Sequence, residues 1–341
     1  MTNVHPLKIF GLGSTKEYAD KVAKNLNISL TPHIEKYFPD GECYVKSSDE
    51  TLGNVRGHDV FIIQSLYSDE FESVADKFMK LCMFCGSLKD ASAHEIIPVI
   101  VHLAWSRQDR KTESRSPVST KYVARMLESC HVNKVLFFDV HNLAAEQNAF
   151  CVPIDNLEGK NLFAEWFADN LLKDGKADRI KILSPDSGGL GRCSRFRTSL
   201  LKQLHKRGAK LDDIEIVIFD KLRIEGKVRG SRIIGNVEDS YVIAFDDMIS
   251  TAETMMKACN AVTQAGGHIY AICATHGLFC GKANEVLDNL NSKIVITDTI
   301  RPWRLNSGNQ NKLHIVDTTK MVAEAIHKIH SGTGSISELL R

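Results

Sequence analysis

The stretch "YVIAFDDMISTAET", residues 241–254, decides the fold class of this chain. An apolar run, Tyr241 to Phe245, ends in two adjacent aspartates, and small hydroxyl residues then lead into a helical pattern. A strand that passes through a polar turn into a helix is the repeating unit of α/β proteins. We therefore expect parallel sheet with crossover helices, and the turn itself is a candidate ligand site because ligands bind beyond the carboxyl ends of such strands.

The same alternation runs through the rest of the chain. Strand-like runs lie at 7–12, 58–65, 95–103, 134–140, 179–185, 214–221, 240–247, 267–277 and 292–299. Helical patterns lie at about 15–26, 70–88, 119–130, 159–173, 189–206 and 252–265. The pattern predicts two tandem α/β domains, at 1–157 and 158–330, each a mainly parallel sheet flanked by helices. "SGTGS" at 331–335 predicts a helix stop before a short tail, 331–341.

Composition excludes several classes of protein. The 341 residues suggest two domains, and 43 Lys and Arg nearly balance 42 Asp and Glu, so no global basic field indicates a nucleic-acid partner. The N-terminus lacks a signal-peptide pattern and no run is long enough to span a membrane, so we expect a cytoplasmic protein. The nine cysteines are expected to be free thiols. Cys82 and Cys85 share the apolar face of a helical pattern, which favours core packing over metal binding.

The turn after Phe245 offers two kinds of ligand group. Asp246 and Asp247 can accept hydrogen bonds from vicinal sugar hydroxyls or reach a metal. Ser250, Thr251 and Thr254 lead into a helix whose free amides and positive dipole suit an anion. A sugar phosphate satisfies both demands. The alternative, a helix N-cap with solvated aspartates, is less favoured because paired acids at a buried strand end are uncommon.

Three other strand ends are polar. In "LSPDSGGLGR", 183–192, Gly188 and Gly189 permit close approach of a ligand and Asp186 can hold a metal, although a plain turn has the same pattern. "SRQDRKTESRSP", 106–117, concentrates cations that suit polyphosphate, and spacing alone does not separate it from a solvated loop. In "FFDVHN", 137–142, His141 can ligate a metal, but a lone histidine is more often structural.

At these residues the chain resembles the ribose-phosphate pyrophosphokinases, or phosphoribosyl pyrophosphate (PRPP) synthetases. The resemblance is collinear over essentially the whole chain and includes "KYFPDGE", "SRQDRK", "DVH", "SPDSGG", "DKLR" and "FDDMIST". It implies two type I phosphoribosyltransferase-like domains, with the nucleotide site and subunit contacts in the first and the ribose 5-phosphate and diphosphate site in the second. The implied reaction transfers diphosphate from ATP to the anomeric hydroxyl of ribose 5-phosphate, and the implied cofactor is Mg²⁺.

The resemblance also implies a role for each matching residue. Phe38, Asp40 and Glu42 would bind the nucleotide, and Arg107 and Gln108 would contact ATP. His141 and Asp186 match magnesium-associated positions, and Asp186, Ser187, Gly188 and Gly189 form the expected diphosphate loop. The expected ribose 5-phosphate loop comprises Asp246, Asp247, Ser250, Thr251, Ala252, Glu253 and Thr254. A homo-oligomer built from dimers, a hexamer or tetramer, is implied as well.

"FDKLRIEGKVRG", 219–230, reads by itself as a basic hairpin with a solvated face. Under the resemblance, Lys221 and Arg223 match mobile-loop cations that close over the reacting phosphates. Positioned cations stabilise a phosphoryl-transfer transition state more than the ground state. The competing hypothesis is a PRPP-synthetase-associated regulatory subunit, against which the presence of these cations and of the paired aspartates argues.

The chain departs from the family pattern in three places. Ser250 replaces an acid and Glu253 a glycine in the sugar-phosphate loop, and a carboxylate beside the phosphate is unfavourable unless it points into solvent. Gly191 replaces a commonly basic residue, although Arg192 follows at once. "DVHNLAAEQNAF" is one residue longer than usual and borders the family's regulatory site, so neither phosphate activation nor ADP inhibition is predicted.

Overall fold

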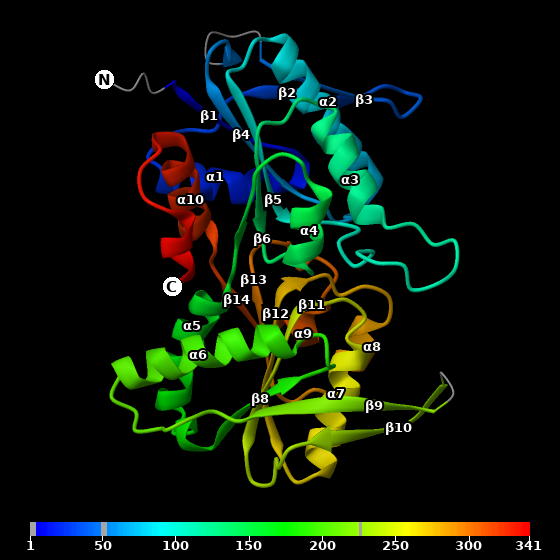
Figure 1. The fold of residues 1–341 in the computed structure, drawn as a ribbon, viewed down its shortest axis with the longest axis vertical. Coiled ribbons are helices and arrows are strands. Elements are labelled where there is room, and N and C mark those ends of the chain that lie inside the picture. Colours follow the sequence, from blue (N-terminus) through cyan, green and yellow to red (C-terminus); the bar gives the residue numbers. More distant parts are fainter. Residues whose placement is uncertain (1–4, 49–52, 225–226) are drawn as a thin grey trace. The chain divides into compact units, whose positions relative to one another are not determined.

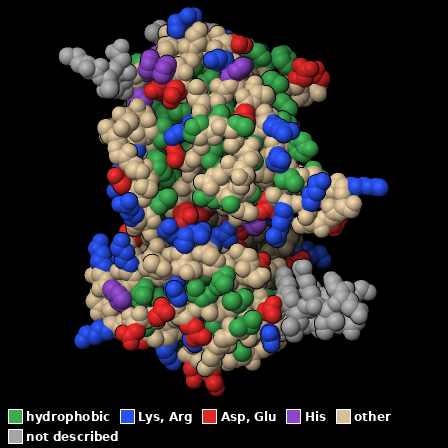
Figure 2. Space-filling model, viewed as in Figure 1, with side chains coloured by type: hydrophobic (Ala, Val, Ile, Leu, Met, Phe, Trp, Pro, Cys, Tyr) green, Lys and Arg blue, Asp and Glu red, His purple; other side chains and the backbone are tan. Residues whose placement is uncertain are grey.

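The computed structural model describes residues 5–48, 53–224 and 227–341, with the side chains of 221–231 outside that description. The chain divides into two compact units, one comprising residues up to Glu158 together with Thr318–Arg341, the other Gly159–Asp317. Acidic and basic side chains are interspersed on the face shown in Figure 2. Among the described residues, no helix has the length and apolar character needed to cross a membrane.

The first unit is built on a five-stranded parallel sheet (Figure 1). Its strands, in the order β1-β4-β5-β6-β7, are β1 (Leu7–Gly11), β4 (Asp59–Ser65), β5 (Glu95–His102), β6 (Val135–Phe138) and β7 (Ile154–Leu157). A separate antiparallel hairpin joins β2 (His33–Tyr37) to β3 (Cys43–Ser47). Its helices are η1 (Gly13–Thr15), α1 (Lys16–Asn25), α2 (Val74–Asp90), α3 (Ser119–Glu128), α4 (Leu143–Ala149), α10 (Thr319–Ser331) and η4 (Ile336–Leu340).

Alternating side chains give this sheet two apolar faces. Phe10, Ile62 and Phe137 join the apolar sides of α2 and α3 in one buried cluster, while α1 and α10 cover the other face (Figure 1). Cys82 and Cys85 are buried in that cluster, which confirms their predicted place in the core. Helix α2 begins at Val74 rather than near residue 70, because Ser73 and Asp76 form a capping box there.

The second unit is built on a seven-stranded sheet in the order β10-β9-β8-β11-β12-β13-β14. Its strands are β8 (Ile180–Ser184), β9 (Ile216–Ile224), β10 (Lys227–Ile234), β11 (Tyr241–Ile249), β12 (His268–Gly277), β13 (Lys293–Thr297) and β14 (Leu313–Val316). Its helices are α5 (Lys160–Lys173), η3 (Ala177–Arg179), α6 (Leu190–Lys206), α7 (Glu253–Gln264), α8 (Ala283–Asp288) and α9 (Ser307–Gln310). Helices α5 and α6 pack on one face and α7 and α8 on the other. All strand pairs are parallel except β9 with β10, the expected hairpin.

The C-terminal segment differs from the prediction. Residues 318–330 were expected in the second domain and 331–341 as a tail, but both belong to the first unit. Tyr18 and Asn25 of α1 hydrogen-bond to Thr318 (2.7 Å) and Thr319 (3.0 Å), which ties α10 to that unit. The amphipathic pattern of α10 predicts a covered face without showing which sheet covers it. Gly332, at φ 65°, ends α10 as "SGTGS" predicted.

Candidate active site

In the second unit, two of the predicted polar turns lie side by side. Strands β8 and β11 are parallel neighbours, so the turn that follows β8 and the segment from Asp246 to Thr254 lie at the same edge of the sheet. The turn expected after Phe245 begins later, because β11 continues to Ile249. Gly189 lies between the two segments, since a Cβ there would lie 2.9 Å from Ser184 Oγ and 3.9 Å from Asp246 Oδ1. A side chain at this position would therefore crowd Ser184 and contact Asp246.

Asp246 and Asp247 share one cation. Arg192, in the first turn of α6, donates from Nη1 to Asp246 Oδ1 over 3.1 Å and lies 3.6 Å from Asp247 Oδ1. The side chains of Asp246 and Asp247 are 24% and 4% exposed. Burial, followed by the charge of Asp247, raises the pKa of Asp246, while Arg192 opposes this. The two acids thus lie beside one guanidinium near the end of β11.

Arg192 was noticed in the sequence only as a neighbour of Gly191 and was not assigned to the site. Its position in the first turn after a glycine-rich strand end is the signal that identifies it. A long side chain there reaches across to the next strand end, because β8 and β11 are adjacent.

The expected sugar-phosphate loop ends in an uncapped helix. Ala252 stands at the N-cap of α7 with φ 62°, and no side chain caps the first turn. Ser250 and Thr254 are half-buried, whereas Thr251 and Glu253 are exposed. Amide groups of an uncapped first turn are available to an anion. Glu253 brings a competing negative charge to the same turn.

The glycine turn at 186–189 already holds a carboxylate. Asp186 Oδ1 accepts hydrogen bonds from the amides of Gly188 (2.9 Å) and Gly189 (3.0 Å), and its carbonyl accepts one from Ser184 Oγ (2.6 Å). Asp186 and Ser187 are exposed. Two convergent amides that satisfy a carboxylate have the geometry for an external anion as well.

In the first unit, the other two polar turns also meet. Asn142, which caps α4, donates from Nδ2 to Asp109 Oδ2 over 2.6 Å, joining the turn after β6 to the turn after β5. Arg107, Gln108 and His141 are exposed on these turns. Gln108 accepts a hydrogen bond from the hydroxyl of Ser119.

Glu146 of α4 is a buried acid that the sequence did not single out. It is 1% exposed, and neither carboxylate oxygen has a hydrogen-bond partner among the described residues. Burial, with a contribution from Asp109, raises the pKa of Glu146 to about 8, while His141 opposes the shift. Nothing in the spacing of "NLAAEQNA" distinguishes it from a solvated helix residue.

Phe38, Asp40 and Glu42 lie together at the exposed end of the β2–β3 hairpin. The Phe38 amide donates to the Glu42 carbonyl (2.9 Å), and Gly41 closes the turn at φ 94°. Phe38 is 42% exposed, and the Lys36 ammonium lies 5.2 Å from its ring centroid. An exposed aromatic ring beside two carboxylates suits contact with a planar, polar group.

A buried ionic network joins this hairpin to α2. Lys80 of α2, 1% exposed, donates to Glu35 Oε2 of β2 over 2.6 Å and also to Glu72. Tyr37 donates its hydroxyl proton to the same Glu72. Although burial opposes it, hydrogen bonds from His33 and Lys80 lower the pKa of Glu35 to about 2. The hairpin is thereby fastened to α2 through charged groups.

Lys221 and Arg223 lie in β9, where they pair in register with Ser231 and Val228 of β10. Their side chains fall outside the described part of the chain, so their predicted role stays a prediction. Among the described residues, no group of three or more His, Cys, Asp or Glu side chains is placed to hold a metal ion. His141 belongs to the first unit and Asp186 to the second.

Comparisons with known proteins agree with this architecture. A model of the N-terminal domain of ribose phosphate pyrophosphokinase matches residues 7–130, and a model of the phosphoribosyl synthetase-associated domain matches residues 223–341. Ribose-phosphate pyrophosphokinase 1 of Streptococcus pyogenes serotype M1 is 36% identical over 332 residues, covering 95% of this chain and 94% of that protein. The ribose-phosphate pyrophosphokinase of Fusobacterium nucleatum is 34% identical over 342 residues, covering 99% of each.

Among solved structures, phosphoribosylpyrophosphate synthetase from Mycobacterium smegmatis matches with a TM-score of 0.83 and 24% identity, over 96% of this chain and 100% of that one. This likeness supports the fold. The chain belongs to the ribose-phosphate pyrophosphokinase family, as its near full-length similarity to curated members shows. The predicted family and fold class are thus confirmed.

Proposed function

We propose that this chain is a ribose-phosphate diphosphokinase, which converts ATP and ribose 5-phosphate to 5-phospho-α-D-ribose 1-diphosphate (PRPP) and AMP. The observation that carries the proposal is the identity of 34–36% to curated ribose-phosphate pyrophosphokinases over nearly the whole chain. We assign the nucleotide site and subunit contacts to the first domain and the ribose 5-phosphate and diphosphate site to the second. A cytoplasmic location follows from this metabolic role.

Ribose 5-phosphate would bind along the turn after β11. Asp246 and Asp247 would accept hydrogen bonds from the ribose hydroxyls, and Ser250 to Thr254 with the first turn of α7 would hold the 5-phosphate. Two features support this placement: the acids are largely buried beside Arg192, and α7 begins without a side-chain cap. Hydroxyl donors satisfy carboxylates without adding charge.

The diphosphate would occupy the turn from Asp186 to Gly189. In the proposed complex it takes the two amides that Asp186 now accepts from, which releases the Asp186 carboxylate. That carboxylate would then be available to magnesium, and His141 stays a predicted magnesium-associated position of the first unit. Mg²⁺ keeps several waters and binds proteins through one or two carboxylates together with substrate phosphates. A single carboxylate beside the diphosphate therefore suits the ion, although no three-ligand group exists among the described residues.

The nucleotide would be held by the β2–β3 hairpin and the turn after β5. Phe38 would stack on adenine, Asp40 and Glu42 would accept from its polar edge or the ribose, and Arg107 and Gln108 would contact ATP. The exposure of all five side chains supports their access to a ligand. We further propose that the hairpin comes from a neighbouring subunit of a homo-oligomer built from dimers, a hexamer or tetramer, which would make a monomer inactive.

Diphosphate transfer needs positioning and charge stabilisation more than acid-base chemistry. The anomeric oxygen forms a bond to the β-phosphorus of ATP, the bond from that phosphorus to the α–β bridging oxygen breaks, and AMP leaves, while the hydroxyl proton passes to solvent. Lys221 and Arg223 would neutralise charge that develops on the equatorial and bridging oxygens. Bound magnesium would supply further neutralisation of the phosphate oxygens.

A catalytically weak or inactive regulatory subunit is the alternative function. The test is to incubate the pure protein with ATP, magnesium and ribose 5-phosphate, with and without inorganic phosphate, and to resolve products by mass spectrometry. We expect AMP and PRPP in equal amounts, and their loss in the Asp246→Asn, Asp247→Asn double variant. If neither product forms under either condition, the chain is instead a regulatory subunit. In that case, adding it to an active relative would change the rate at which that relative forms PRPP.

A further inference from the structure

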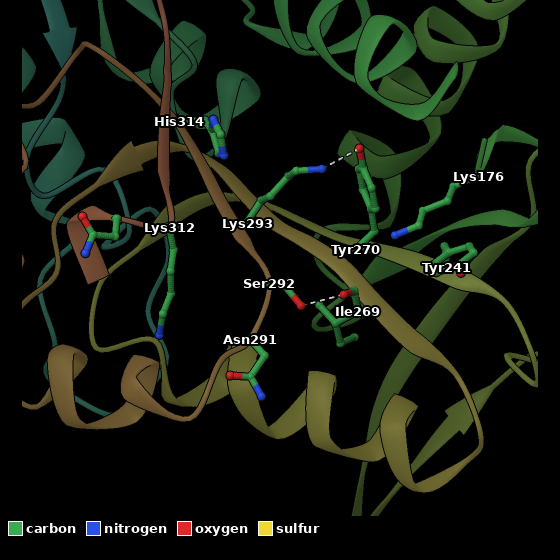
Figure 3. Close-up of a pocket in the computed structure, with 10 residues that line it drawn as sticks. Lys176, Tyr241, Ile269, Tyr270, Asn291, Ser292, Lys293, Lys312 and His314 are labelled. Atoms are coloured by element: carbon green, nitrogen blue, oxygen red, sulfur yellow. Dashed lines mark hydrogen bonds between the residues drawn. The ribbon is translucent and has the colours of Figure 1, made fainter. Parts of the chain in front are cut away.

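A pocket of about 430 Å³ opens at the amino edge of the second sheet (Figure 3). It is lined by the starts of β11, β13 and β14, by residues at the start of β12 and by Lys176, which follows α5. Asp246, by contrast, lies toward the carboxyl end of β11. The pocket is therefore distinct from the proposed substrate turns, and its interpretation does not depend on the proposed function.

The lining of the pocket is cationic. It contains Lys176, Lys293, Lys312 and His314 and no aspartate or glutamate. One acid stands beside it, because Lys293 donates from Nζ to Asp174 Oδ2 over 2.7 Å. Tyr270 donates to the same oxygen over 2.9 Å. Asp174 thus compensates the charge of Lys293 and holds its side chain in place. The other two lysines leave a net positive charge at the pocket.

Lys176 carries an ammonium group without a hydrogen-bonded or ion-paired acid among the described residues. It lies over the ring of Tyr241, 4.5 Å from the centroid, and 5.4 Å from the centroid of Tyr270. Figure 3 shows its amino group directed between the two rings. The rings hold the cation in place while leaving its hydrogen-bond donors free for an anion.

Lys312 and His314 complete the opposite wall. The Lys312 ammonium donates to the carbonyls of Leu287 (3.0 Å) and Asp288 (3.4 Å) and to Asn309 Oδ1 (3.1 Å). These bonds use its three donors, so Lys312 contributes positive charge to the pocket rather than a hydrogen bond. The His314 ring packs against Trp166 with centroids 5.2 Å apart. Burial, and then the charge of Lys293, lowers the pKa of His314, so the ring is a neutral hydrogen-bonding group near neutral pH.

We propose that this pocket binds a small phosphate ester of sugar-phosphate or mononucleotide size. Lysine ammonium groups bind phosphate as point charges. The volume lies in the range of small-molecule sites and exceeds what an inorganic phosphate ion fills. Asn291, Asn311 and Ser292 add neutral polar groups to the lining, which suit the hydroxyl groups of such an ester.

The test measures binding calorimetrically, with Trp166 fluorescence as a second readout. The probes are fructose 1,6-bisphosphate and uridine 5′-monophosphate, with fructose and uridine as uncharged counterparts and citrate as a carboxylate polyanion. We expect at least one ester to bind and its counterpart not to. Lys176→Gln should weaken binding about tenfold or more, because it removes a charge-assisted contact. Lys173→Gln, an exposed lysine at the end of α5, should leave the affinity unchanged.

The Asp246→Asn variant tests whether the ester binds in this pocket or at the opposite edge of the sheet. Unchanged ester binding in that variant, together with loss in Lys176→Gln, supports the proposal. It is overturned if neither ester binds, if citrate binds as tightly as the esters, if Lys176→Gln has no effect, or if Asp246→Asn abolishes binding. Because none of these readouts is enzyme activity, their failure is distinguishable from failure of the proposed function.

Discussion

Arg192 of α6 reaches both acids of the β11 turn, at 3.1 Å from Asp246 Oδ1 and 3.6 Å from Asp247 Oδ1. Arg192 thus lies beside two adjacent carboxylates, and burial together with the charge of Asp247 raises the pKa of Asp246. If these acids receive the ribose hydroxyls, Arg192 helps to keep Asp246 ionised and able to accept. It acts through the acids and is in this sense a positioning residue.

Arg192→Gln should therefore raise the KM for ribose 5-phosphate about tenfold, the cost of one lost charge-assisted contact. Without the cation the pKa of Asp246 rises further, so the acidic limb of the pH profile of kcat/KM should move to higher pH. Steady-state kinetics between pH 6 and pH 9 would measure both effects. Arg197→Gln, one turn further along α6 in an exposed ion pair, is the matched control. An unchanged pH profile in Arg192→Gln would remove Arg192 from the site.

Glu253 is exposed in the first turn of α7, where a bound 5-phosphate would meet it. Glu253→Gln removes the like charge and keeps the side-chain shape, so the KM for ribose 5-phosphate should fall about threefold at low salt. The gain should shrink as salt increases, because exposed charges are screened. Glu285→Gln, an exposed acid on α8, serves as the control. Equal KM values for Glu253→Gln and the parent protein would mean that the carboxylate points away from the phosphate.

Local sequence pattern indicates the strands that form the site, whereas tertiary contacts determine which charged side chains are buried there. The polar turn at Asp186 was predictable, because an apolar run that stops at polar residues indicates the carboxyl edge of a parallel sheet. The strand end expected at Asp246 was placed too early, because β11 continues to Ile249, which pairs with Gly277 of β12. The burial of Glu146 could not be predicted from the sequence, since it depends on how α4 packs against neighbouring segments. The role of Lys80 was hidden as well, because Glu35 lies in another element, and Glu72 comes before α2, outside the helical pattern that contains Lys80.

Lys221 tests the catalytic role of the β9–β10 hairpin. Lys221→Ala should lower kcat by orders of magnitude while thermal unfolding stays the same, because the lost interaction belongs to the transition state. Lys227→Ala, in the paired strand, is the matched lysine control and should retain most of the turnover. Single-turnover measurement of AMP release would show whether the chemical step has slowed. A kcat equal to that of the parent protein would exclude Lys221 from the mechanism.

The raised pKa of Glu146 predicts that the free energy of unfolding of the first unit falls as pH rises. Its pKa is raised from the usual 4.5 to about 8, so the folded state binds the proton more tightly than the unfolded state. The associated stability is complete below about pH 4.5 and is lost as pH rises toward 8, roughly 5 kcal/mol in total. Glu146→Gln should therefore stabilise the first unit at pH 8 and have little effect at pH 5. Urea unfolding at both pH values would measure this.

Glu17→Gln on the exposed side of α1 controls for the loss of one negative charge. The same pH dependence in Glu146→Gln as in the parent protein would show that another group is responsible.

The ionic network under the β2–β3 hairpin predicts that removing one of its charges lowers the free energy of unfolding more than removing all of them. Lys80→Met leaves Glu35 and Glu72 without their shared cation in a buried setting and should lower the free energy of unfolding by about 3–5 kcal/mol. The triple variant Lys80→Met, Glu35→Gln, Glu72→Gln removes the charges together, and most of that loss should be recovered. Lys89→Met, an exposed lysine on the same helix, should be nearly neutral. Because the network fastens the hairpin that carries Phe38 to α2, hydrogen exchange of the hairpin amides should accelerate in Lys80→Met and slow again in the triple variant. Equal stability of Lys80→Met and Lys89→Met would mean that the buried charges contribute no net free energy.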